Sequence, residues 1–257
     1  MVTKKDLLIV GSKSGLGKFL HENIPSIEFS RNTPIKEFNR LQREGVNTII
    51  HCAYNSKKEV KLSDFTEYIS DNVLLTNKIT KIPNSKFIYI STVDVYPKDR
   101  TLHSEEEDIF IDRIKNIYPI TKIMSESIVR KNCKNPLILR CSGLLGENIK
   151  INTLVKLFNG LPLTLSSNSI FNYISHTDVL DFIKIGLKRD LFGVYNLSSS
   201  KNETLQEIAN NLKLKPQFGD YFYDVGKIDN TKAKAILPSL KKSTSEVIKK
   251  FIGNNKI

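Results

Sequence analysis

The chain opens its regular pattern with Leu7-Leu-Ile-Val-Gly-Ser-Lys-Ser-Gly-Leu-Gly17, an apolar run followed at once by three closely spaced glycines. Four consecutive apolar residues that end at a glycine are typical of a strand buried on both faces, as in a parallel sheet. Leu16, Phe19 and Leu20 follow at helical spacing, so they predict a helix packed on this strand. The strand, turn and helix together predict an α/β fold.

The same alternation of apolar runs and helical stretches continues along the chain. It predicts a Rossmann-like, doubly wound parallel sheet. We expect strands at residues 7–10, 27–30, 48–52, 87–90, 137–140 and 193–197. We expect helices after Gly17 and at residues 35–43, 65–79, 111–131, 149–159, 177–187, 204–212 and 243–252.

The alternation loosens after Gly146. We therefore expect two parts, a nucleotide-binding core over residues 1–145 and a smaller, mainly substrate-binding lobe over residues 146–257. Residues 193–197 are predicted to return to the core sheet.

The three glycines have the spacing GxxxGxG, which differs from the dinucleotide fingerprint GxGxxG. The physical roles are the same, because Gly11 permits a tight turn, Gly15 lets the backbone approach a pyrophosphate, and Gly17 allows close helix–strand packing. An ordinary turn between a strand and a helix is the alternative. We favour a cofactor site that includes the intervening loop residues Lys13, Ser14 and Leu16.

The end of the second predicted strand indicates which dinucleotide binds. An acidic residue there would bind the adenine ribose hydroxyls of NAD, whereas this strand ends in Ser30-Arg31. A hydroxyl and a guanidinium suit the 2′-phosphate of NADP(H), and Lys13 adds a second cation. NADP(H) is therefore favoured, while Glu28, two residues too early, keeps NAD(H) open.

Tyr118 and Lys122 stand four residues apart in a predicted helix, so their side chains share one face. We expect the ammonium to lower the pKa of the phenol, which suits Tyr118 to proton exchange. Thr92 ends an earlier strand and can hydrogen-bond the same substrate oxygen. Alone, YxxxK is a weak motif in a Lys-rich chain. The order of glycine loop, strand-end hydroxyl and YxxxK predicts hydride transfer at a carbinol or ketone.

With these residues in view, the chain resembles the extended short-chain dehydrogenase/reductase family, in its NAD-dependent epimerase/dehydratase group. His51-Cys-Ala53 is similar to the family's His-x-Ala strand end, and Asn72 to the Asn of its Asn-Val-x-x-Thr helix. The segment from Ser91 to Tyr96 resembles Ser-Ser/Thr-x-x-Val-Tyr, which places Thr92 at the catalytic position. The resemblance implies that Ala53, Asn72, Tyr118 and Lys122 contact the cofactor.

The resemblance also implies a nucleotide-sugar substrate and a role in polysaccharide biosynthesis. It leaves open whether the protein forms a homodimer. Val93 stands where the sugar dehydratases carry an acid, so 4,6-dehydration is disfavoured. The segment Val-Tyr-Pro-Lys98 is similar to the corresponding segment of a 4-keto-sugar reductase of this family. We therefore expect an NAD(P)H-dependent reductase of a 4-keto nucleoside-diphosphate sugar, with Ser91, Asp94 and Tyr173 near the substrate.

Two other functions stay open at this point. A nucleotide-sugar 4-epimerase would use the same residues but keep NAD tightly bound. A dinucleotide-binding sensor or scaffold without chemistry is less favoured, because such proteins often lack the Tyr or the Lys, and this chain has both.

The composition of the chain indicates which partners and which location to expect. The chain has 257 residues and a formal net charge of +12, but its Lys residues are spread along the whole length. No basic block with interleaved aromatics stands out, so we expect no nucleic-acid partner. Three irregularly spaced Cys predict neither a disulfide framework nor a metal site. No apolar run approaches the roughly 18 residues that span a bilayer, so we expect no membrane contact and a cytoplasmic location.

Overall fold

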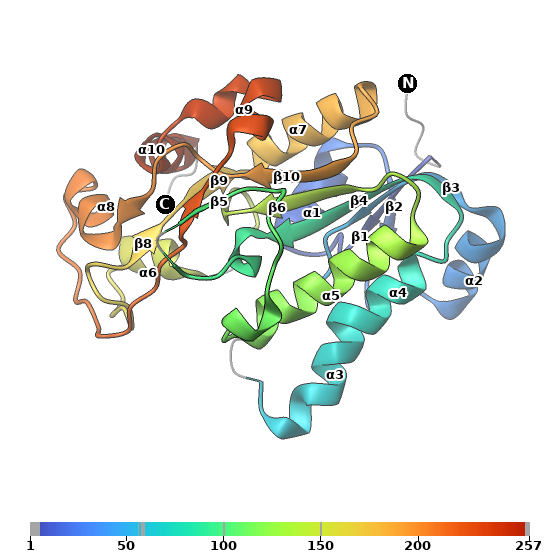
Figure 1. The fold of residues 1–257 in the computed structure, drawn as a ribbon, viewed down its shortest axis with the longest axis horizontal. Coiled ribbons are helices and arrows are strands. Elements are labelled where there is room, and N and C mark those ends of the chain that lie inside the picture. Colours follow the sequence, from blue (N-terminus) through green and yellow to red (C-terminus); the bar gives the residue numbers. More distant parts are fainter. Residues whose placement is uncertain (1–5, 56, 58–59, 100, 150, 255–257) are drawn as a thin grey trace.

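The computed structural model describes residues 6–55, 57, 60–99, 101–149 and 151–254. Its centre is a six-stranded parallel sheet with the order β10-β6-β4-β3-β1-β2. Figure 1 shows the sheet between layers of helices. The strands are β1 (Leu7–Val10), β2 (Ile27–Phe29), β3 (Val46–His51), β4 (Asn84–Thr92), β6 (Leu137–Cys141) and β10 (Gly193–Leu197). The predicted doubly wound sheet is confirmed, including the return of Gly193–Leu197 beside β6.

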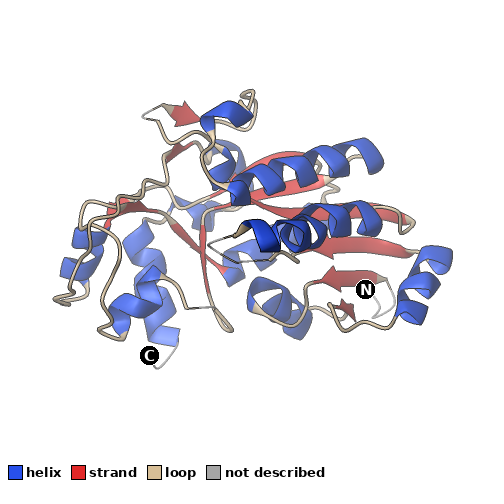
Figure 2. Cartoon of the chain, turned by 90° about the horizontal axis from the view of Figure 1, so that it is seen from below, coloured by secondary structure: helices blue, strands red, loops and turns tan. Residues whose placement is uncertain are grey.

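Helices cover both faces of this sheet (Figure 2). One layer contains α1 (Gly15–Asn23), α7 (His176–Lys188) and α9 (Thr231–Ile236). The other contains α2 (Ile35–Glu44), α4 (Leu75–Ile79) and α5 (Ile117–Asn132). A π-helical turn, Ser70–Leu74, joins α3 (Phe65–Ile69) to α4 and makes one continuous segment.

Strand residues alternate between the two layers. In β1, Leu7 and Ile9 pack against α1 and α7, whereas Leu8 and Val10 pack on the side of α2 and α4. Successive side chains of a strand point to opposite faces, and here both faces are covered. This explains why the run at residues 7–10 is apolar without interruption.

A second core lies beside the sheet. It is built from residues between Leu145 and Phe251 and packs α6 (Thr153–Phe158), α8 (Leu205–Asn211) and α10 (Thr244–Asn254) together. Figure 1 shows these helices grouped at the left of the molecule. The remaining strands are short: β5 (Leu102–His103), β7 (Gly143–Leu145), β8 (Ile170–Phe171), β9 (Tyr173–Ser175), β11 (Glu203–Thr204) and β12 (Lys227–Ile228).

Two helices begin later than the sequence pattern predicts. α5 starts at Ile117 rather than at residue 111, after a separate turn at Ile111–Arg113. Pro119 explains the difference, because proline fits the first turn of a helix and would break one that began at 111. α6 starts at Thr153 rather than at 149, since the Asn152 side chain caps it by accepting from the Val155 N–H.

Candidate active site

A cleft of about 2020 Å³ opens at the carboxyl ends of the central strands. Its floor includes the residues that end β1, β3, β4 and β6, and its far wall comes from segments around Tyr173 and Tyr223. β2 and β3 lie on opposite sides of β1, so the direction of winding changes there. Ligands of open α/β sheets bind at such a switch point.

The glycine loop has the geometry that a pyrophosphate requires. Gly11 has φ of +93°, which allows the tight turn after β1, and it donates its N–H to the carbonyl of Phe29 at the end of β2, at 2.8 Å. A Cβ on Gly17 would lie 2.2 Å from the Gly11 carbonyl oxygen. A Cβ on Gly11 would lie 2.7 Å from the Ala53 nitrogen. The loop therefore brings the N-terminus of α1 close to the strand ends, a cradle that fits a dinucleotide.

The two cations expected to read a 2′-phosphate are both paired with carboxylates. Lys13 Nζ lies 2.7 Å from Glu28 Oε2, and Arg31 Nη2 lies 2.6 Å from Asp71 Oδ2. Both cations line the cleft, together with Ser14, Leu16 and Ser30. An incoming phosphate would compete with Glu28 and Asp71 for them.

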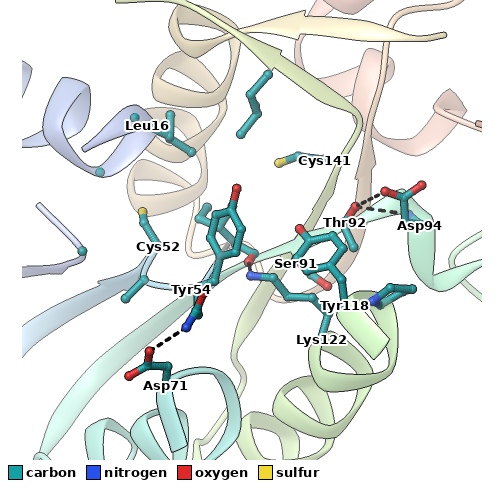
Figure 3. Close-up of a pocket in the computed structure, with 18 of the residues that line it drawn as sticks. Leu16, Cys52, Tyr54, Asp71, Ser91, Thr92, Asp94, Tyr118, Lys122 and Cys141 are labelled. Carbon is teal, nitrogen blue, oxygen red and sulfur yellow. Dashed lines mark hydrogen bonds between the residues drawn. The ribbon is translucent and has the colours of Figure 1, made fainter. Parts of the chain in front are cut away.

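β4 and α5 bring the predicted catalytic residues together. Thr92 is the last residue of β4, and Tyr118 lies in the first turn of α5. Both side chains line the cleft, and the Thr92 hydroxyl is close enough to affect the pKa of Tyr118. Figure 3 shows Tyr118 and Lys122 extending from α5 toward the end of β4.

The pKa of Tyr118 differs from the sequence-based expectation. Burial raises this pKa well above its usual range, and the neighbouring Tyr54 and Asp94 raise it further, while the Thr92 hydroxyl lowers it. The prediction that Lys122 sets a lowered pKa was wrong for this structure, because desolvation outweighs the contacts that favour the phenolate. Tyr118 is therefore a protonated phenol at neutral pH, the form that can donate a proton.

Lys122 lies behind Tyr118 and is buried. Its Nζ donates to the Ile90 carbonyl oxygen at 2.8 Å and lies 5.0 Å from the ring centroids of both Tyr54 and Tyr89. Burial lowers the pKa of Lys122 to about 8. The aromatic rings favour the charged form, which offsets part of the desolvation.

The predicted substrate residues have different surroundings. Ser91 donates its hydroxyl to Glu126 at 2.6 Å, so this hydroxyl is already engaged with a buried carboxylate. Asp94 and Tyr173 line the cleft. Tyr173 is buried, and burial raises its pKa. Asp94 and Tyr173 thus face the space where a substrate can enter.

Among the predicted cofactor residues, Asn72 is not one of those that line the cleft. It is buried behind the cleft wall, where its Oδ1 accepts from the Asn55 N–H at 2.6 Å. Asn72 therefore supports the loop after β3, and its contact with the cofactor stays a prediction. Ala53, in the same loop, does line the cleft.

Two tyrosines of the cleft were missed by the sequence analysis. The ring of Tyr54 lies tilted against that of Tyr118, with 5.6 Å between their centroids. The place of Tyr54 directly after the His51-Cys-Ala53 strand end was a usable signal. Tyr223 donates its hydroxyl to Asp94 Oδ1 at 2.9 Å. Its surrounding segment has no hydrophobic periodicity, so no sequence pattern indicates its position.

The parallel sheet, the glycine loop and the Tyr118–Lys122 pair define an NAD(P)-dependent enzyme of the extended short-chain dehydrogenase/reductase class. The chain belongs to the NAD dependent epimerase/dehydratase family, whose profile matches residues 16–198. Its family and structural neighbours are NAD(P)-dependent nucleotide-sugar reductases and epimerases. A search of curated proteins found no significant match.

Solved structures share the fold over nearly the whole chain. A dTDP-4-dehydrorhamnose reductase from Bacillus anthracis, in complex with NADP, is 19% identical with a TM-score of 0.82, covering 98% of this chain and 100% of that one. A UDP-glucuronic acid 4-epimerase from Bacillus cereus, in complex with UDP-glucuronic acid and NAD, is 16% identical with a TM-score of 0.79, covering 97% and 99%. MoeE5, in complex with UDP-glucose and NAD, is 16% identical with a TM-score of 0.79, covering 96% and 97%.

Within the described ranges, no helix has both the length and the apolar character needed to cross a membrane.

Proposed function

We propose that the protein is an NAD(P)H-dependent reductase of a 4-keto nucleoside-diphosphate sugar, with NADP(H) as the preferred cofactor. The observation that carries the proposal is that the Thr92 and Tyr118 side chains both line the cleft at the carboxyl end of β4, close enough for the Thr92 hydroxyl to lower the pKa of Tyr118. Two hydroxyls that meet in a cleft can both bond one carbonyl oxygen. This is the arrangement that stabilises charge on that oxygen as it becomes an alkoxide.

Each residue then has a distinct task. Tyr118, held as a neutral phenol by burial, donates its proton to the carbonyl oxygen, and Thr92 donates a hydrogen bond to the same atom. Lys122 presents an ammonium beneath this pair and would hold the ribose next to the nicotinamide. The nicotinamide, when bound, supplies the hydride.

The glycine loop and the cations beside it support dinucleotide binding. Gly11 and Gly17 allow the loop and α1 to pack closely on the strand ends, and the open space beside Gly15 leaves room for a pyrophosphate to approach the backbone. Arg31 and Lys13 line the adenosine end of the cleft and supply charge for a 2′-phosphate. Glu28 and Asp71, the carboxylate partners of these two cations, would suit NAD if they faced the ribose in place of the cations.

A 4-epimerase is the second candidate, supported by the fold shared with a UDP-glucuronic acid 4-epimerase. The two functions differ in how the cofactor is kept. A reductase releases its oxidised cofactor each turnover, whereas an epimerase retains it.

The test is made with the purified full chain, desalted and then given NADPH or NADH with dTDP- or UDP-linked 4-keto-6-deoxyhexoses. The reductase proposal predicts sugar-dependent loss of absorbance from the reduced cofactor over many turnovers. Stoichiometric NAD that survives desalting, with interconversion of two 4-hydroxy sugars and no net oxidation of NADPH, would instead establish the epimerase.

A further inference from the structure

A second polar group lies next to Thr92 in the same cleft. Asp94 follows β4 in the turn Val93–Val95, and Lys98 lies four residues further on. Tyr223 reaches the same carboxylate from a segment 129 residues away in sequence. Figure 3 shows the Asp94 carboxylate beside the Thr92 hydroxyl.

The two oxygens of Asp94 have different neighbours. Oδ1 accepts from Tyr223 Oη at 2.9 Å and from Lys98 Nζ at 2.7 Å. Oδ2 has the Thr92 hydroxyl at 3.5 Å, the limit of a hydrogen bond. A carboxylate oxygen can accept about two hydrogen bonds. Oδ1 is therefore saturated, whereas Oδ2 keeps acceptor capacity on the side of the catalytic hydroxyl.

Contacts of both the backbone and the ring hold Tyr223 in place. Its carbonyl accepts from the Ile170 N–H at 2.7 Å, and its N–H donates to Ser169 Oγ at 3.1 Å. Its ring lies 5.1 Å from that of Phe171. Burial also raises the pKa of Tyr223 well above its usual range, so the phenol stays a donor. Lys98 reinforces the link by donating to the Val225 carbonyl at 3.3 Å.

We propose that Tyr223 and Lys98 hold Asp94 so that its Oδ2 accepts the hydroxyl on the ring carbon next to the reacting carbonyl. Tyr223 is thus a positioning residue for sugar recognition. The inference rests on the function proposed above.

The spacing of the two groups supports this assignment. Thr92 Oγ1 and Asp94 Oδ2 lie 3.5 Å apart, so a ligand whose carbonyl oxygen is bound by Thr92 brings the hydroxyl of the neighbouring ring carbon within reach of Oδ2. In a 4-keto pyranose only C3 offers a ring hydroxyl beside the carbonyl, because C5 carries the ring oxygen. The site therefore selects sugars with a free C3 hydroxyl over 3-deoxy sugars.

Titration calorimetry with the full chain and saturating NADP⁺ tests the proposal. The probes are UDP-glucose and dTDP-glucose, each with its 3-deoxy counterpart. Tyr223→Phe removes one oxygen and keeps the ring packing. Tyr195→Phe is the matched control, because Tyr195 lies in β10 and is not among the residues that line the cleft. Loss of a hydrogen bond to a charged group predicts about tenfold weaker binding of the 3-hydroxy sugar to Tyr223→Phe.

The 3-deoxy sugar should bind wild type and Tyr223→Phe equally, and Tyr195→Phe should match wild type with both probes. Lys98→Met removes the other donor to Oδ1 and should show the same pattern of binding as Tyr223→Phe. It provides the test if Tyr223→Phe folds poorly. Equal affinity of wild type and Tyr223→Phe for the 3-hydroxy sugar, or equal losses for both sugars, overturns this inference alone. A wild type that binds no nucleotide sugar overturns the proposed function and this inference together.

Discussion

Lys122 donates a hydrogen bond from its ammonium to the Ile90 carbonyl oxygen, at 2.8 Å, and so ties α5 to the carboxyl end of β4. Burial lowers the pKa of this ammonium to about 8. The group is charged below that pH and becomes neutral above it. Any ligand that binds the charged form must therefore bind less well as the pH rises through about 8.

We expect the affinity for NADPH to be constant between pH 6 and pH 7, well below the pKa of about 8, and to fall above that value. Fluorescence titration with NADPH at a series of pH values measures this. Lys122→Met keeps the length of the side chain without the charge, so its affinity should be lower and should show no step near the same pH. An identical pH profile in the variant would contradict a role of Lys122 in binding.

The pair between Arg31 and Asp71 makes a prediction about cofactor choice. Arg31→Ala should weaken NADPH binding by about tenfold or more, because it removes a charge-assisted phosphate contact. The affinity for NADH should barely change. Asp71→Asn should act in the opposite direction, since it releases Arg31 from its carboxylate partner at 2.6 Å. Dissociation constants for both cofactors decide the matter. Equal losses of NADPH and NADH in Arg31→Ala would show that Arg31 does not read the 2′-phosphate.

The central sheet could be predicted because its determinants are local. The run at residues 7–10 is continuously apolar, residues 193–197 (Gly-Val-Tyr-Asn-Leu) are rich in strand-forming residues, and the structure places both in the sheet at those bounds. The meeting of Thr92 and Tyr118 also followed from topology, since a strand's carboxyl end and the start of the next helix on that face lie close together.

The features of the site that the sequence does not predict depend on packing between residues far apart in the chain. The partners of Lys13 and Arg31 are 15 and 40 residues away, and their pairing needs the folded geometry. The raised pKa of Tyr118 comes first from desolvation, which the spacing of two residues on one helix does not report. Tyr223 reaches the cleft only because its backbone is paired with Ile170.

A buried ion pair beneath the site predicts a large loss of stability. Glu126 and Arg140 are both buried, 2.8 Å apart, and Glu126 also accepts from Ser91. Glu126→Gln should cost about 3 kcal/mol in the free energy of unfolding, because it leaves the Arg140 charge uncompensated. Urea denaturation measures this. Glu44→Gln, which breaks an exposed pair with Arg40, is the control and should change little. Similar small effects in both variants would contradict the burial of the pair.

Gly17 predicts a steric effect on both folding and binding. A Cβ there would lie 2.2 Å from the Gly11 carbonyl oxygen, so Gly17→Ala should displace α1 from β1. We expect a loss of about 1–3 kcal/mol in stability and a marked loss of dinucleotide affinity. Gly253→Ala in α10 is the control, because nothing lies within 4 Å of its added carbon. Thermal unfolding with and without NADPH compares the two. Gly17→Ala with wild-type affinity would contradict the close packing of the loop.

Tyr118→Phe tests the proton donor. The variant keeps the ring but removes the hydroxyl, so turnover should fall by about 100-fold or more, while NADPH affinity changes little. Thr92→Val should cost less, because it removes one hydrogen bond to the same substrate oxygen, and Thr92→Ser should be mild. Steady-state kinetics and cofactor titration separate the two effects. Normal turnover in Tyr118→Phe would rule out its role as donor.

The most direct test follows the hydrogen itself. The wild-type protein is given NADPH deuterated at the transferable position of the nicotinamide, together with a 4-keto-6-deoxy nucleotide sugar, and the sugar product is analysed by mass spectrometry and NMR. A reductase at this site predicts one deuterium at C4 of the sugar for each NADP⁺ released, and almost no labelled product from Tyr118→Phe. A product without deuterium at C4, or sugar conversion with no release of oxidised cofactor, would contradict the account.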